Sequence, residues 1–169
     1  MNPVLARWNA LDAEAAASEV LPCCGSRSWA RLLAAKRPFA EEVSLLDAAS
    51  DIWLALPQSD WREAFDSHPR IGQQHAVFAT AQSLAWSAQE QSRAAPDEAA
   101  KRALAEANRR YEEQFDRIFI VCATGKTSSE ILSILESRMH NDPATELREA
   151  AEQQRQITQL RLRRWLEAN

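Results

Sequence analysis

The sequence predicts an all-α protein, a single-domain compact bundle of about seven or eight helices that covers residues 1–169. Only three glycines occur, and long segments rich in alanine, glutamate and leucine separate them. These three residue types are strong helix formers. No segment alternates apolar and polar residues with the period of two that is typical of a strand, and the chain has no internal repeat. A chain of 169 residues is also long enough for one domain with a substantial core.

The N-terminal part predicts three helices. The first is short and carries the apolar residues Val4, Leu5 and Trp8. The second is expected to run from near Asp12 to Leu21. PCCGSRSW then forms a turn, in which Ser26 or Ser28 can cap a third helix because a serine hydroxyl accepts hydrogen bonds from the first turn of a helix.

The next two helices are bounded by polar residues and prolines. Ser44, with Asp47 three residues later, predicts a helix start, and Pro57 predicts its end. Asp60 and Glu63 are expected to open the following helix, DWREAFDS, which runs into a histidine-proline pair.

After Gly72 the sequence is typical of one helix as far as Ser87, where the Ser87–Glu90 pattern S-x-x-E predicts a capping box and a new helix start. Pro96 breaks the chain again. A long helix is then expected from about Asp97 to Phe115, with one apolar stripe formed by Leu104, Ala107, Tyr111 and Phe115.

The segment FIVCATGKTSSE predicts an extended apolar stretch, a glycine turn and a capping box between Thr127 and Glu130. The final helix should begin after Asp142, with Pro143 at its first position. Its buried stripe is expected to contain Leu147, Ala150, Gln154, Ile157, Arg161 and Trp165.

Composition restricts the function classes. The net charge is −4 and no dense basic stripe occurs, which argues against nucleic acid as the main partner. No apolar stretch approaches the length of a membrane span, so no membrane partner is expected. The three cysteines lack C-x-x-C spacing, which indicates reduced thiols. The N-terminus has no signal-peptide pattern, so a cytoplasmic location is predicted.

The stretch FDSHPRIGQQH places His68 directly before a proline. Because a residue before proline is disfavoured in the α conformation, the helix should end at or just before His68. An imidazole fixed there can act as an acid and a base near neutral pH. The alternative is a helix-terminal histidine that caps carbonyl groups, and for an isolated His-Pro pair this alternative is favoured. No metal is expected, because the spacing of His68 and His75 is not that of a helical metal pair.

Two further polar residues stand out. Glu90 lies next to Gln91, whose amide both donates and accepts hydrogen bonds, but a capped helix start accounts for Ser87 and Glu90 equally well. Arg161 falls on the buried stripe of the last helix, where an unpaired charge is expensive, so either an anionic partner or a ligand is implied. An arginine that extends to solvent at a helix end is the alternative.

Several segments, taken in order and with their spacing, resemble the OHCU decarboxylase family (2-oxo-4-hydroxy-4-carboxy-5-ureidoimidazoline decarboxylase) of urate breakdown. They are CCGSRSWARLL, RPF, DWREAFDSHPRIG, SAQEQ, FIVCATGKTSSEIL and ITQLRL. The resemblance spans nearly the whole chain. HPRIG, followed by S-x-x-E-Q and then FIVCA, is its most specific part.

The resemblance implies an all-helical, often dimeric decarboxylase that converts OHCU to (S)-allantoin without a metal or an organic cofactor. It implies His68, Glu90 and Arg161 as catalytic residues, with His68 as the acid/base. It also implies that two segments each form one wall of the substrate-binding pocket, and that Pro69 and Arg161 contact the substrate beside these walls. The walls are Ser87, Ala88, Gln89, Glu90 and Gln91, and the backbone of Phe119, Ile120, Val121, Cys122 and Ala123.

The same resemblance implies a homodimer and a place in the pathway after urate oxidase and 5-hydroxyisourate hydrolase. Three alternatives stay open on the residues alone. The chain could act on a related ureido acid, or be a non-catalytic helical binding module. It could also be a metal-dependent hydrolase that uses His68 and His75.

Overall fold

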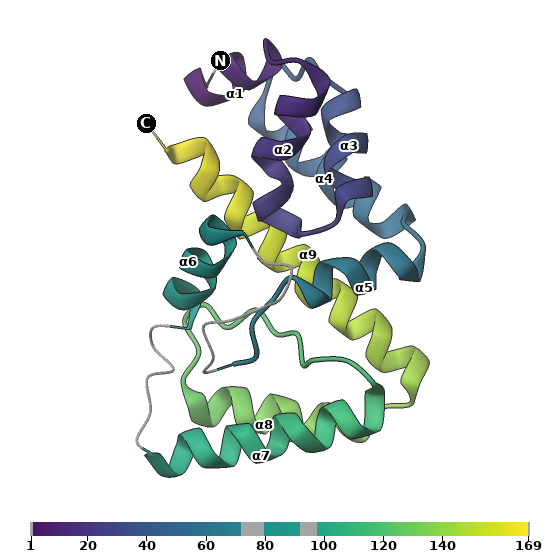
Figure 1. Cartoon of the computed structure of the whole chain (residues 1–169), viewed down its shortest axis with the longest axis vertical. Coiled ribbons are helices and arrows are strands. Elements are labelled where there is room, and N and C mark those ends of the chain that lie inside the picture. Colours follow the sequence, from purple (N-terminus) through teal and green to yellow (C-terminus); the bar gives the residue numbers. More distant parts are fainter. Residues whose placement is uncertain (1, 72–79, 92–97, 169) are drawn as a thin grey trace. The chain divides into compact units, whose positions relative to one another are not determined.

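The computed structural model describes residues 2–71, 80–91 and 98–168, and every regular element among them is an α-helix (Figure 1). The all-α prediction is therefore confirmed, but these residues form nine helices rather than seven or eight. The short first helix expected around Val4, Leu5 and Trp8 is among them, and the Asn2 side chain caps it by accepting from Val4 N at 2.8 Å. The helices are α1 (Pro3–Asn9), α2 (Ala13–Cys24), α3 (Arg27–Ala35), α4 (Glu42–Ala55), α5 (Gln58–Asp66), α6 (Ala81–Glu90), α7 (Glu98–Phe115), α8 (Ser128–Arg138) and α9 (Pro143–Glu167).

Several predicted helix ends are confirmed. Ser26 caps α3 by accepting from Trp29 N at 3.2 Å. The capping box before α8 is complete, because Thr127 N donates to the Glu130 carboxylate at 2.7 Å and Glu130 N donates to the Thr127 hydroxyl at 3.3 Å. Pro143 is the first residue of α9. At these positions local chemistry alone was enough to locate the end of a helix.

Other predicted starts are wrong. α4 begins at Glu42, so Ser44 lies inside its first turn, and α5 begins at Gln58, two residues before Asp60. The predicted restart at Ser87 does not occur, because Thr80 already caps α6 by accepting from Ser83 N at 3.1 Å. Once that cap is made, S-x-x-E is an ordinary helical spacing with both residues on one face.

The described chain divides into two compact units. The terminal unit comprises residues 1–64 and 155–169, and the central unit comprises residues 65–154. The long helix α9 supplies residues to both. The single domain predicted for residues 1–169 stays a prediction.

The core of the terminal unit is built around three tryptophans that are almost fully buried, Trp8, Trp29 and Trp53. Helix α3 packs against both α2 and α4. Each buried indole N–H in this packing needs an acceptor. Trp8 Nε1 donates to Ala16 O at 2.9 Å, and Trp29 Nε1 donates to Ala49 O at 3.0 Å, so both polar atoms are satisfied by backbone carbonyls.

In the central unit, α7 and α8 lie side by side and enclose an apolar cluster (Figure 1). The predicted stripe of α7 is confirmed, because all four of its residues are buried. The extended segment 119–123 packs on this stripe. The cluster comprises Leu104, Ala107, Tyr111, Phe115, Phe119, Val121, Ala123, Ile131 and Leu135.

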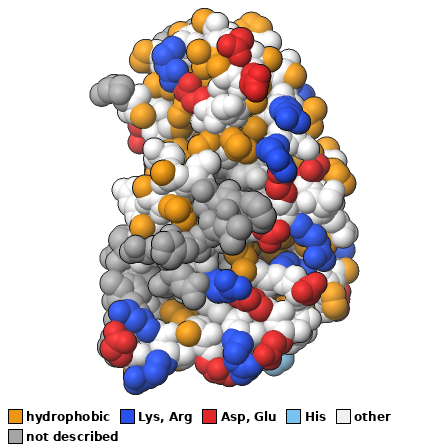
Figure 2. All heavy atoms as spheres, viewed as in Figure 1, with side chains coloured by type: hydrophobic (Ala, Val, Ile, Leu, Met, Phe, Trp, Pro, Cys, Tyr) orange, Lys and Arg blue, Asp and Glu red, His pale blue; other side chains and the backbone are white. Residues whose placement is uncertain are grey.

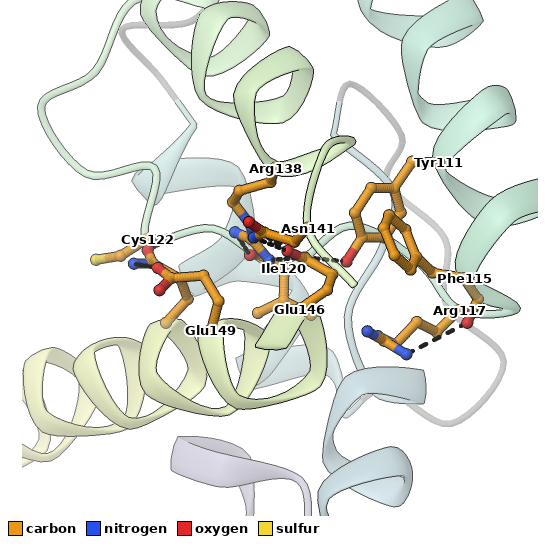
Figure 3. Close-up of polar contacts among 10 residues, drawn as sticks. Tyr111, Phe115, Arg117, Ile120, Cys122, Arg138, Asn141, Glu146 and Glu149 are labelled. Atoms are coloured by element: carbon orange, nitrogen blue, oxygen red, sulfur yellow. Dashed lines mark hydrogen bonds and ion pairs between the residues drawn. The ribbon is translucent and has the colours of Figure 1, made fainter. Parts of the chain in front are cut away.

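A buried ion pair connects three elements of the central unit. Arg138 at the end of α8 contacts the Glu146 carboxylate of α9 at 2.5 Å, and both side chains are buried (Figure 3). The Tyr111 hydroxyl donates to the same carboxylate, and Asn141 donates to it at 2.9 Å. Burial, together with the hydrogen bond to Glu146, raises the pKa of Tyr111 well above its usual range. This phenol therefore stays a neutral donor.

The surface carries charges of both signs. On the face drawn in Figure 2, acidic and basic side chains are interspersed rather than gathered into a field of one sign. Within the part of the chain that is described, no helix has the length and apolar character needed to cross a membrane.

We expect Glu146→Gln to lower the free energy of unfolding by about 3–5 kcal/mol, because it leaves the Arg138 guanidinium buried without its counter-charge. Urea denaturation measures this change. The matched control is Arg109→Gln, which breaks exposed ion pairs with Glu106 and Glu113 on α7. It should leave the unfolding midpoint almost unchanged.

The double variant Arg138→Met/Glu146→Leu should recover much of the stability that Glu146→Gln loses, because it removes both charges from the interior. If Glu146→Gln were as stable as the wild type, the ion pair between Arg138 and Glu146 would not contribute to the free energy of unfolding.

Candidate functional site

His68 lies two residues beyond the last residue of α5, Asp66. Its backbone N–H donates to Phe65 O at 3.0 Å, which closes the end of the helix. The residue before a proline avoids the α conformation, and this limits how far the helix can extend. The predicted helix end is therefore confirmed. The imidazole is half-buried, and the ring of Pro69 beside it is buried.

The imidazole is held from α9 by a side chain that the sequence had not assigned to the site. His68 Nε2 and Gln154 Oε1 are 2.6 Å apart, and Gln154 is fully buried. The sequence did contain a signal, since Gln154 is an amide on a helix stripe that is apolar except for Gln154 and Arg161. A buried amide needs a hydrogen-bond partner, and that requirement points to another polar group nearby.

The predicted wall on α6 divides into two faces. Ser87 and Glu90 are buried, with exposed fractions of 3% and 8%, as expected for residues three apart on a helix. Ala88 and Gln89 are exposed, and Gln91, the C-cap of the helix, is half-buried. Ser87 and Glu90 are thus the members of this wall whose side chains face the protein interior.

The segment Phe119–Ala123 forms neither helix nor strand, and all five of its residues are buried. Its backbone is held by side chains on both sides. Arg138 Nη1 donates to Ile120 O at 2.6 Å, and Cys122 N donates to Gln153 Oε1 at 2.9 Å. The Arg138 guanidinium also lies over the Phe119 ring, 4.6 Å from its centroid. At least two polar groups of the backbone that the family resemblance assigns to the substrate are thus bonded within the protein, and Figure 3 shows Arg138 beside Ile120.

Arg161 belongs to the terminal unit and is 1% exposed. Its Nη1 donates to Pro22 O at 3.2 Å, so a backbone carbonyl of α2 is one of its partners. Burial raises the pKa of the neighbouring Cys23 thiol well above its usual range, and the positive charge of Arg161 opposes that rise. Burial likewise raises the pKa of Cys24, to about 12. Both thiols are therefore neutral at physiological pH.

Residues 72–79, which include His75, and residues 92–97 lie outside the described part of the chain. His140 is exposed just beyond the end of α8, where its Nδ1 lies 3.1 Å from Glu136 O. Among the residues that are described, no group of three or more His, Cys, Asp or Glu side chains is arranged to hold a metal ion.

Comparison with known proteins gives four likenesses. The family model described as OHCU decarboxylase matches residues 9–163. The uric acid degradation bifunctional protein TTL of Arabidopsis thaliana is 37% identical over 143 residues, which are 83% of this chain and 44% of that protein. The chain thus spans less than half the length of this relative.

Two solved structures share the fold. One is a crystal structure of OHCU decarboxylase in the presence of (S)-allantoin, with a TM-score of 0.77 and 35% identity; the match covers 89% of this chain and 98% of that one. The other is a crystal structure of (S)-allantoin synthase, with a TM-score of 0.71 over 95% of this chain and 53% of that one. At 17% identity the second likeness concerns the fold alone.

The Cys122 amide gives a direct test of how segment 119–123 is held. We expect Gln153→Leu to lower the opening free energy of this amide by about 1–3 kcal/mol, since the N–H loses its Gln153 acceptor. Native-state hydrogen exchange measures it. Gln153→Glu is the comparison variant: it loses the donation from Gln153 Nε2 to Glu149 Oε1 at 3.0 Å, but it keeps an oxygen at the same position and should preserve the protection of the Cys122 amide. Equal protection in the wild type and Gln153→Leu would contradict this role of Gln153.

Proposed function

Because the chain belongs to the OHCU decarboxylase family, we propose that it catalyses the decarboxylation of 2-oxo-4-hydroxy-4-carboxy-5-ureidoimidazoline to (S)-allantoin. The observation that carries the proposal is the family match over residues 9–163. A related structure, which this chain covers almost completely, was determined in the presence of (S)-allantoin and gives further support.

The proposed substrate carries a carboxylate and a hydroxyl on one ring carbon, next to a carbon in a C=N bond. When the bond to the carboxylate breaks, CO2 leaves and the electron pair passes into the C=N, whose nitrogen takes up a proton. The hydroxyl then loses its proton as a carbonyl forms, and the neighbouring ring carbon gains one. From the protein this reaction needs orientation, a proton carrier and a site in which the carboxylate is less well solvated than in water.

His68 is our candidate for the proton carrier. An imidazole exchanges protons near neutral pH, and this one is fixed by its backbone N–H, by the following proline and by Gln154. It would take the hydroxyl proton or deliver a proton to the ring carbon. Protonation of that carbon from one face only would produce the S enantiomer.

The other sequence-based assignments remain part of the proposal. Glu90 supplies a carboxylate that can accept from the ureido N–H groups or orient the imidazole, and its burial strengthens such contacts. Arg161 would bind the substrate carboxylate or carbonyl oxygens through its planar guanidinium. The walls 87–91 and 119–123 would bind the rest of the substrate. The homodimer, the cytoplasmic location and the supply of substrate by urate oxidase and 5-hydroxyisourate hydrolase also stay predictions.

The first test generates the substrate from urate with urate oxidase and 5-hydroxyisourate hydrolase and follows the circular dichroism of the allantoin formed. We expect rapid appearance of an optically active product with the wild type. His68→Ala should lower the rate by about 10²–10⁴-fold, the usual contribution of general acid–base catalysis. Slow, optically inactive product with the wild type would contradict the proposed reaction, and full turnover by a folded His68→Ala would contradict the role of His68.

Glu90→Gln tests the carboxylate on α6. We expect kcat to fall by about tenfold to a hundredfold, because a substrate or imidazole that is misoriented reacts slowly. The exposed residue Gln82 of the same helix, which lies outside the proposed wall, gives the control: Gln82→Ala should retain its fold and change kcat less than Glu90→Gln does. Equal effects of the two substitutions would contradict the assignment of Glu90.

A further inference from the structure

We propose that Gln154 is a positioning residue, which holds His68 in the tautomer that carries its hydrogen on Nε2. The neutral ring then has its lone pair on Nδ1, so that Nδ1 is the nitrogen that accepts the proton. The catalytic consequence rests on the proposed function, because it requires His68 to be the proton carrier. The structural part, the control of the tautomer, can be measured without any substrate.

The contact itself is short and well buried. His68 Nε2 lies 2.6 Å from Gln154 Oε1, and no part of Gln154 is exposed to solvent. In a buried environment a hydrogen bond is electrostatically stronger than in water, and an unpaired polar atom is expensive. A rotation of the imidazole that turns Nε2 away from Gln154 would therefore raise the free energy of the folded protein.

The chemistry of the amide decides the tautomer. A glutamine oxygen can only accept, so the ring nitrogen facing it must carry a hydrogen. Because the amide is neutral, it fixes this hydrogen without adding a negative charge that would favour the protonated ring. A neutral partner suits a residue that has to release its proton as well as take one up.

The position of Gln154 suits this role. It lies on α9, a helix of 25 residues, and a residue on a helix is held more firmly than one on a loop. Its neighbour Gln153 accepts from Cys122 N at 2.9 Å. Two consecutive residues of one helix thus hold the proposed proton carrier and the segment 119–123, which is one of the two proposed substrate walls.

The test uses the full chain with ¹⁵N-labelled histidine. The His68 signals are identified by their loss in His68→Ala, and the two ring-nitrogen shifts report which nitrogen carries the hydrogen. We expect the wild type to carry it on Nε2. In Gln154→Leu this preference should be lost, and kcat should fall by about 10–100-fold, less than or equal to the loss in His68→Ala. KM should change less than kcat.

Gln154→Glu is the rescue variant, because its carboxylate keeps an oxygen acceptor at the same position. It should restore the hydrogen on Nε2 and recover part of the turnover. Gln159→Leu is the matched control on the same helix. Gln159 donates to Leu46 O at 2.7 Å and to the Ser50 hydroxyl at 3.0 Å. Gln159→Leu therefore removes structural hydrogen bonds but leaves the contact between Gln154 and His68 in place.

The outcomes separate this inference from the proposed function. A wild type without decarboxylase activity whose tautomer still depends on Gln154 would overturn the function and support the positioning. An unchanged tautomer in Gln154→Leu, or an equal loss of kcat in Gln159→Leu, would overturn the positioning. If Gln154→Leu does not fold, Gln154→Glu decides, because the loss of the Nε2 hydrogen in that variant also overturns it.

Discussion

The arrangement of the central unit depends on the buried ion pair between Arg138 and Glu146. A charge in the interior is stable only while its hydrogen bonds and its counter-charge are in place. Here one guanidinium also holds Ile120 O, and one carboxylate also accepts from the Tyr111 hydroxyl. The end of α8, the start of α9, the C-terminal part of α7 and the segment 119–123 are therefore fixed together, because movement of any one leaves a buried charge without its counter-charge or without one of its hydrogen bonds.

Helix α9 holds other parts of the central unit through further polar side chains in its N-terminal half. Glu146, Gln153 and Gln154 each send a polar group to a different partner, namely Arg138, the Cys122 amide and the His68 ring. These residues lie within about 12 Å along the helix axis, given the rise of each residue. A single stiff helix thus sets the positions of the proposed proton carrier and of the segment that would face the substrate. Rigid elements of this kind keep the reacting groups of an enzyme in a productive geometry.

Burial changes what the sequence motifs mean. Ser87 and Glu90 have the spacing of a capping box, yet they lie within one continuous helix that Thr80 caps. Their spacing places both side chains on the buried face, while Ala88 and Gln89 point to solvent. The backbone of segment 119–123 was expected to bind substrate, but Arg138 and Gln153 bond two of its polar groups. In both cases a pattern with two local interpretations was resolved by what packs against it.

The sequence by itself determined the helical class, a serine cap for α3 at Ser26 or Ser28, the cap at Thr127, the start of α9 at Pro143, the helix end before His68 and the family. All of these follow from interactions between residues close in the chain or from motifs read in order. The partner of His68 was decided only by the tertiary structure, because it lies 86 residues away in sequence at Gln154. Helical periodicity indicates that Gln154 is buried, but it contains no information about which distant polar group meets it. That pairing depends on how residues far apart in the chain come together within the central unit.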